Sequence, residues 1–316
     1  MITLPAFSQF QRVQTAGLLT LSAAVLLCTM IAAAHAQQSF KSADEAASTL
    51  ASAARSGDRA AILTVLGRDG ADIVSSGDAV ADEATRQRFL TAYDEKHQIE
   101  MDGNDKAIMV VGRDDFPFPI PLARKDGGWR FDTAAGRLEI LYRRIGRNEL
   151  DAIQACLAFV DAQNDYADKD HGAGVGTYAR RIVSQPGRKD GLYWPAGAGE
   201  DQSPLGERVA DATAEGYRIG AVRAPFHGYY YRILTHQGPN APGGALDYVV
   251  RGKMIGGFAL VAYPAEYGNS GVMTFLVSHG GTVYQKDLGL RTAQIALRMT
   301  SFNPDQTWKK VDTATQ

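Results

Sequence analysis

Residues 226–289 read FHGYYYRILTHQGPNAPGGALDYVVRGKMIGGFALVAYPAEYGNSGVMTFLVSHGGTVYQKDLG, and this stretch decides the fold of the second half of the chain. Its β-branched and aromatic runs are interrupted by glycine, proline and asparagine, a pattern typical of short strands joined by tight turns. Turns are expected near residues 269–271 and 280–281. The stretch therefore predicts an antiparallel sheet, and it contains no catalytic motif.

The start of the chain has the parts of a secretory signal peptide. Arg12 supplies a positive charge, residues 16–34 are nearly all apolar, and Ala34 and Ala36 form an A-x-A cleavage signal. The sequence predicts export to a bacterial periplasm, with cleavage of residues 1–36 after Ala36. No later apolar run approaches the ~20 residues that a membrane span needs, so no stable membrane insertion is expected after cleavage.

Composition limits the classes of protein that this chain can belong to. Its 316 residues are 45% hydrophobic, which is enough for two domains with cores of their own. Lys and Arg number 33 against 35 Asp and Glu, with no basic block, so nucleic acid is not an expected partner. Only Cys156 would remain after cleavage, which rules out an intrachain disulfide. No cofactor is expected.

Residues 37–146 are expected to form an α+β domain. Ser42 and Glu45 make a capping box before a helix that Gly57 ends, and Asp58 caps a second helix. A change to period two then predicts a sheet of hairpins. This order resembles the NTF2-like (cystatin-like) domains, in which a helix lies in the concavity of a bent sheet. The remaining elements of this domain are expected at residues 81–96 (helix), 99–101, 107–111, 120–123 and 129–131 (strands), with a hairpin turn at 125–128.

Residues 147–312 are expected to form a second domain of one helix and an antiparallel sheet. A helix over residues 134–145 is expected to be interrupted at Gly146, and Asn148 is expected to cap the next helix, which ends near Asp168. Beyond it the sequence predicts an irregular connection at residues 172–216, short helices at 204–214 and 290–299, and a polar tail at 313–316.

Three aromatic and glycine-rich runs, at residues 225–231, 237–244 and 257–268, resemble the bacterial domain-of-unknown-function family 2950. The resemblance covers essentially the whole mature chain. It implies an exported protein of Gram-negative bacteria and supplies no activity or catalytic residue.

A second likeness concerns the C-terminal half. A helix, a Gly/Tyr-rich connection and strands that carry residues 262–268 and 274–275 are similar to pilin-like head domains. Pilins begin with the apolar helix that polymerises them, whereas this helix is internal and polar on one side. Only the architecture of the head is therefore expected to be shared.

Three carboxylates, those of Asp161, Asp165 and Asp168, line one face of the predicted helix at positions i, i+4 and i+7. Such a face either holds a hard cation or is simply solvated, and the solvated face is the preferred interpretation. A calcium loop begun at Asp168 would place Ala179 where the bidentate glutamate belongs. No metal is therefore assigned.

Glu266, His227 and His236 are the candidates for catalysis. Glu266 lies in a turn among aromatic residues, where it serves either as an acid–base group or as an acceptor of backbone N–H bonds that fix the turn. The two histidines are nine positions apart and would point to opposite faces of a regular strand, so they are not a natural dyad. Cys156, on the apolar face of a helix, is expected to be a buried hydrophobe rather than a nucleophile.

A binding surface is the other candidate site. Alternating tyrosines beside the Gly/Pro-rich loop of residues 237–244 suit contact with a sugar or a peptide, although such tyrosines also pack across strands. The candidate binding residues are Tyr229, Tyr231, Tyr263, Tyr267 and Asn240.

Three functions follow as hypotheses. The first is a non-catalytic module that binds or scaffolds an unidentified envelope component or protein partner. The second is an envelope hydrolase that uses Glu266 with His227 or His236. The third is an accessory protein of pilus or secretion biogenesis.

Overall fold

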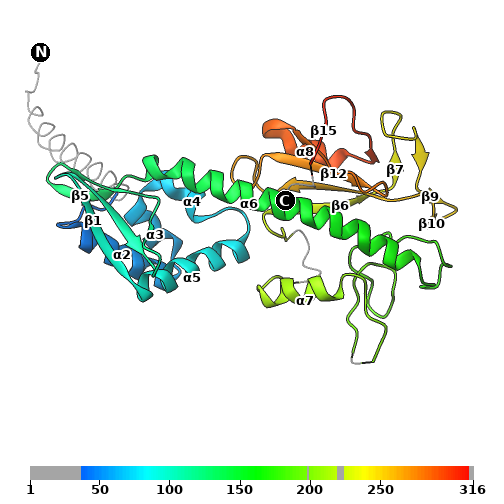
Figure 1. Ribbon diagram of the computed structural model, residues 1–316, viewed down its shortest axis with the longest axis horizontal. Helices are drawn as coiled ribbons and strands as arrows, with labels where there is room; N and C mark the ends of the chain where they lie inside the picture. The colour runs from blue at the N-terminus through cyan, green and yellow to red at the C-terminus, as the bar shows by residue number, and fades with distance from the viewer. Residues whose placement is uncertain (1–36, 198, 219–223, 313–316) are drawn as a thin grey trace, which may run out of the picture.

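The computed structural model describes residues 37–197, 199–218 and 224–312, in which a long helix, α6 (Thr133–Ala167), joins two units end to end (Figure 1). With 35 residues and a rise of 1.5 Å per residue, α6 is about 50 Å long. The first unit has helices packed on a small sheet, and the second has a sheet with helices around it, so the mixed α+β class is confirmed. The NTF2-like and pilin-head-like assignments stay predictions. The signal peptide and the tail lie outside the described residues.

The caps of the first helices follow the sequence closely. The Ser42 side chain accepts a hydrogen bond from the backbone N–H of Glu45, and Gly57 ends the helix in the left-handed conformation. In a capping box the Glu45 carboxylate would accept from the N–H of Ser42; here it accepts from the N–H of the preceding residue, Lys41. The helical elements of this unit are α2 (Ala43–Ser56), α3 (Arg59–Leu66), η1 (Arg68–Gly70), α4 (Ala71–Val74) and α5 (Ala79–Glu95).

The sheet of the first unit is antiparallel, with β3 paired to β2 outside the main order β1-β2-β4-β5. The expected hairpin turn joins β4 to β5. Asp126 and Gly127 both have positive φ (52° and 78°), as the two central residues of a type I′ turn require. One face packs on α2, whose buried side is largely alanine. The strands are β1 (His97–Asp102), β2 (Lys106–Val111), β3 (Phe116–Pro117), β4 (Leu122–Lys125) and β5 (Gly128–Phe131).

The predicted break at Gly146 is wrong, because α6 runs through it without interruption. A glycine costs an exposed helix only about 1 kcal/mol relative to alanine, which is too little to end a helix that packs on both units. Asn148 is not a cap, since its side-chain amide donates to the carbonyl of Ser270. The division at residues 146/147 stays a prediction, although each unit has a hydrophobic cluster of its own.

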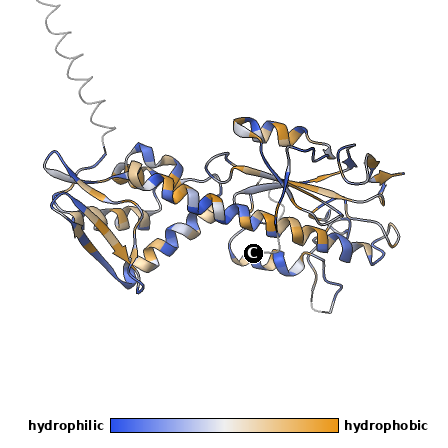
Figure 2. Cartoon of the chain, turned by 45° about the horizontal axis from the view of Figure 1, so that its top comes forward, coloured by the Kyte–Doolittle hydropathy of each residue, from blue (hydrophilic) through white to orange (hydrophobic). Residues whose placement is uncertain are grey.

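The second unit is built on an antiparallel sheet of order β15-β13-β12-β11-β6. α6 packs on β12 and β11 from one side, and α8 packs on β11 from the other (Figures 1 and 2). Every residue of β11 is buried because both faces of the sheet are covered. The sheet's strands are β6 (Tyr229–Leu234), β11 (Ala259–Pro264), β12 (Met273–Ser278), β13 (Tyr284–Asp287) and β15 (Lys309–Lys310).

Smaller elements complete this unit. β14 pairs with β7 in parallel, a feature that the expected antiparallel sheet did not include. Among the described residues, no helix has the length and apolarity that crossing a membrane demands. These elements are α7 (Gly206–Ala214), η2 (Gly289–Arg291), α8 (Thr292–Arg298), β7 (His236–Gln237), β8 (Leu246–Asp247), β9 (Val249–Val250), β10 (Lys253–Met254) and β14 (Ser301–Phe302).

Candidate functional site

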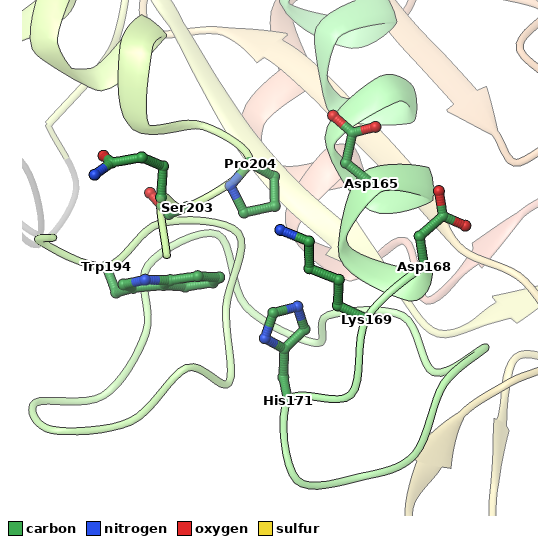
Figure 3. Close-up of a pocket in the computed structure, with 8 residues that line it drawn as sticks. Asp165, Asp168, Lys169, His171, Trp194, Ser203 and Pro204 are labelled. Carbon is green, nitrogen blue, oxygen red and sulfur yellow. The ribbon is translucent and has the colours of Figure 1, made fainter. Parts of the chain in front are cut away.

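A hollow of about 400 Å³ lies beside the C-terminal end of α6 (Figure 3). The last turns of the helix and the residues just after it form one side, and the irregular connection that leads to α7 forms the other. Both polar and aromatic side chains face it. Its lining residues are Asp165, Asp168, Lys169, His171, Trp194, Gln202, Ser203 and Pro204.

His171 is held in this hollow by aromatic rings. It stacks on Tyr166, with ring centroids 4.2 Å apart, and lies 5.2 Å from the ring of Trp194. Burial lowers the pKa of His171 below its ordinary value of 6.5. The imidazole is therefore neutral at pH 7, with one ring nitrogen as a donor and the other as an acceptor.

Asp201 neutralises the two lysines nearest to the hollow. Its carboxylate accepts from Lys169 Nζ at 2.9 Å and lies 3.6 Å from Lys189 Nζ. Lys189 also sits 5.3 Å above the ring of Trp194, whose indole N–H donates to the Asp201 carbonyl. These contacts fix Trp194 and leave the hollow without an unpaired cation among its described lining residues.

Two polar atoms at the hollow have hydrogen-bonding capacity that the described residues do not use. Ser203 is 6% exposed, and its hydroxyl is buried without a partner. The Nε2 atom of His171 is buried without a partner as well. Because buried polar groups are nearly always hydrogen-bonded, these two atoms are positions that water or the polar groups of a ligand can fill.

The predicted acidic face of α6 is exposed. Asp161, Asp165 and Asp168 all lie in solvent, and only the last two border the hollow. Among the described residues, no group of three His, Cys, Asp or Glu side chains is arranged to hold a metal ion. The solvated face stays a prediction for these carboxylates.

His227 lies where α6, α7 and the start of β6 meet. Its backbone is left-handed (φ 49°), so it precedes the regular strand rather than belonging to it. Nδ1 is 3.2 Å from the Asp151 carboxylate and Nε2 is 3.2 Å from that of Glu215. The hydrogen bond with Asp151 raises the pKa of His227, and this effect exceeds the opposing effect of burial.

Asp78, which the sequence analysis did not single out, is the polar centre of this junction. It is fully buried. One oxygen caps α5 by accepting from the N–H groups of Val80 and Ala81, and the other accepts from Tyr217 O–H (2.9 Å) and Gly228 N–H (2.8 Å). Aspartate is a favoured N-cap residue, and this was the signal in the sequence that could have identified Asp78. It was missed because the helix was expected to begin three residues later, at Ala81.

The catalytic candidates are not brought together. The exposed Glu266 accepts from the side-chain amide of Asn269, and among the described contacts no histidine bonds to it. The turn is fixed mainly by the main-chain carbonyl of Glu266, which accepts from the N–H groups of Asn269 and Ser270. His236 faces Asp247 at 3.6 Å, so it is not paired with His227, whose partners are on α6 and beside α7.

The tyrosine face is largely part of the core. Tyr229 is fully buried and Tyr263 is 7% exposed, so these two rings do not form an open contact surface. Tyr231 has a buried hydroxyl, and Tyr267 donates its O–H to Asp287.

Asn240 remains exposed in a loop that is held by one side chain of its own and by one from outside it. Its backbone N–H donates to Asn303, and the Gln237 amide donates to the carbonyls of Pro242 and Gly244. A binding role for Asn240, Tyr231 and Tyr267 stays a prediction.

Cys156 is buried, as expected from its place on the apolar face of the helix. Burial raises the pKa of its thiol from 9.0 to about 12, which disfavours the thiolate that a nucleophile requires.

These features define an α+β protein with two hydrophobic clusters and a polar hollow at the end of its longest helix. A family model described as "Protein of unknown function (DUF2950)" matches residues 37–311, so the chain belongs to this family. Comparisons with curated proteins and with solved structures found no match. The resemblance read from the aromatic and glycine-rich runs is therefore confirmed, whereas the likeness to pilin heads stays a prediction.

Proposed function

We propose that this chain is an exported periplasmic protein that acts as a non-catalytic binding module of the cell envelope. Its ligand is a small polar molecule, or a polar group of a larger envelope component, and it binds in the hollow beside Ser203. The segment at residues 1–36 supports export.

The observation that carries this proposal is the unpartnered Ser203 hydroxyl in the wall of the hollow. A buried donor or acceptor without a partner costs about 1–3 kcal/mol, and a ligand that bonds to it recovers that free energy. The Nε2 atom of the neutral His171 ring, which lines the same hollow, is a second buried atom without a hydrogen-bond partner. The volume of about 400 Å³ lies within the range of small-molecule sites.

A thermal-shift screen of the mature protein from Gln37 onward, against peptidoglycan fragments, glycans, peptides and divalent cations, tests the proposal. A ligand at 100 times its Kd stabilises the folded state by about 2.7 kcal/mol, which gives a clear rise in Tm. A flat screen on folded protein would contradict a small-ligand module and favour a protein partner.

The Ser203→Ala variant identifies the site of any ligand that is found. Removing an unpaired hydroxyl is expected to leave the free protein as stable as wild type or slightly more stable, while the ligand-induced rise in Tm falls. Ser48→Ala, on the exposed side of α2, is the matched control and should keep the full rise. Equal rises in both variants would place the ligand elsewhere.

A further inference from the structure

A second hollow, of about 490 Å³, lies next to the first and shares no lining residue with it. Tyr166, in the wall of the second hollow, stacks on His171 of the first. The other walls come from the connection after α6 and from the β9–β10 hairpin. The charged residues that line it are Arg180, Arg181, Arg188, Lys253 and Asp190.

Local backbone structure brings these side chains to one place. Arg251 and Gly252 have positive φ (50° and 80°) and form the two-residue turn that joins β9 to β10, so Lys253 begins the returning strand at the rim. The N–H of Tyr178 donates to the Met254 carbonyl, which ties the connection to that strand two residues before Arg180. Arg188 follows a turn in which its N–H donates to the Gln185 carbonyl.

The positive charge of this hollow is largely uncompensated. In the part of the chain that the structure describes, Arg181 is the only one of these cations that faces a carboxylate, that of Asp190, at 3.7 Å. Arg180 and Lys253 donate to the main-chain carbonyls of Gly252 and Ala173, which carry no net charge. The Arg188 guanidinium has no hydrogen bond or ion pair among the described residues.

Four cationic side chains thus face one carboxylate in a chain whose formal net charge is −2. Three of the four are arginines, whose planar guanidinium groups form paired hydrogen bonds with phosphate or carboxylate oxygens. A concave site of one sign also concentrates ions of the opposite sign. A single carboxylate would neutralise only part of this charge, whereas a multiply charged phosphate group matches it better.

We propose that this second hollow binds a ligand through a multiply charged phosphate group, either on a soluble phosphorylated molecule or on the head group of an anionic lipid. Arg188 and Arg180 supply the principal hydrogen bonds, and Lys253 contributes its charge. The site is distinct from the hollow beside Ser203, so each can exist without the other.

Calorimetric titration of the mature protein with inorganic pyrophosphate at low salt is the test. Saturable binding is expected, and it should weaken as NaCl is raised, since the attraction is electrostatic. Arg188→Gln and Arg180→Gln should each weaken binding about 10-fold, the loss expected for one charge-assisted hydrogen bond. Arg208→Gln, which makes the same charge change at an exposed position of α7, is the control and should leave the affinity unchanged.

Sedimentation with vesicles separates the two sources of the phosphate group. Binding to vesicles that contain phosphatidic acid, whose phosphomonoester can carry two negative charges, but not to pure phosphatidylcholine, together with its loss in Arg188→Gln, would assign a lipid head group. Binding of pyrophosphate without binding to vesicles would assign a soluble ligand. Failure of both probes to bind, or equal weakening by Arg208→Gln and Arg188→Gln, would overturn the proposal.

The Ser203→Ala variant keeps this test separate from the proposed function. It should bind pyrophosphate as wild type does, because Ser203 does not line the second hollow.

Discussion

His227 makes the stability of the fold depend on pH. Its imidazole lies between Asp151 and Glu215, with the Asp78 carboxylate also acting on it, and the folded protein therefore binds the proton more tightly than the unfolded chain does. A raised pKa contributes stability that is fully present below the unfolded value of about 6.5 and is lost as the pH rises through the folded value.

We therefore expect His227→Gln to destabilise the protein more at pH 6 than at pH 8. Urea midpoints of wild type and variant at the two pH values measure this difference. His236→Gln, at an exposed position, serves as the control. An equal loss of stability at both pH values in His227→Gln would show that the histidine does not form these ion pairs.

Cys156 is the second residue with a testable chemical state. Because the thiol is buried and burial raises its pKa to about 12, a thiol reagent at pH 8 is expected to label the native protein slowly. In 8 M urea, labelling should be complete at the rate of a free cysteine. Fast stoichiometric labelling of the native protein would make Cys156 accessible and reactive.

At the scale of single residues, the sequence predicts those features that depend on residues nearby in the chain. The Ser42 cap and the end at Gly57 depend on neighbours within one helix, and the burial of Cys156 follows from its place on the apolar face of its helix; all three were predicted correctly. For Tyr229 and Tyr263 the sequence left open whether they are exposed for contact or packed across strands, because the alternation of a strand separates two faces without saying whether each is covered. Here α6 and α8 cover both.

At the scale of elements, α6 contains two glycines, Gly136 and Gly146, and neither ends the helix. A Cβ added at Gly146 would meet no atom within 4 Å, whereas one added at Gly136 would lie 2.4 Å from the Pro119 carbonyl oxygen. The two glycines of one helix therefore have different roles. Gly146 is tolerated, and Gly136 permits the close approach of the helix to residues 119–120.

Gly146→Ala is expected to stabilise the protein by about 0.5–1 kcal/mol, the difference in helix propensity between the two residues. Gly136→Ala is expected to destabilise it by roughly 1–3 kcal/mol, because the backbone must move apart. Urea denaturation of both variants measures the changes. Destabilisation by Gly146→Ala would indicate that the helix is broken there after all.

At the scale of the whole molecule, a polar junction ties the two units together in addition to α6. Arg144 donates to the carbonyls of Asp72 and Ile73 and to the side chain of Asn269, which in turn donates to the Ser75 carbonyl. Asp78 adds its bonds to the second unit. Sequence patterns did not predict this junction, because its partners lie up to 194 positions apart and are of types that are usually exposed.

The junction should make the two units unfold together. Trp129 belongs to the core cluster of the first unit and Trp194 to that of the second, whereas the third tryptophan, Trp308, packs against the second cluster. Variants in which Trp308 and one of the other two are replaced by phenylalanine therefore report on one unit each by fluorescence. With Asp78 intact, we expect both probes to give the same urea midpoint, which is the signature of a single cooperative transition.

Asp78→Ala should separate the two midpoints. The substitution removes the acceptor of two backbone N–H groups at the start of α5 and of two donors in the second unit, and each unsatisfied buried group costs about 1–3 kcal/mol. The Trp129 midpoint is expected to fall further, since the first unit loses the cap of α5 as well as the junction. Asp58→Ala removes only the exposed cap of α3, so both midpoints should fall together. Coincident transitions in Asp78→Ala would mean that the bonds of Asp78 are not needed to couple the two units.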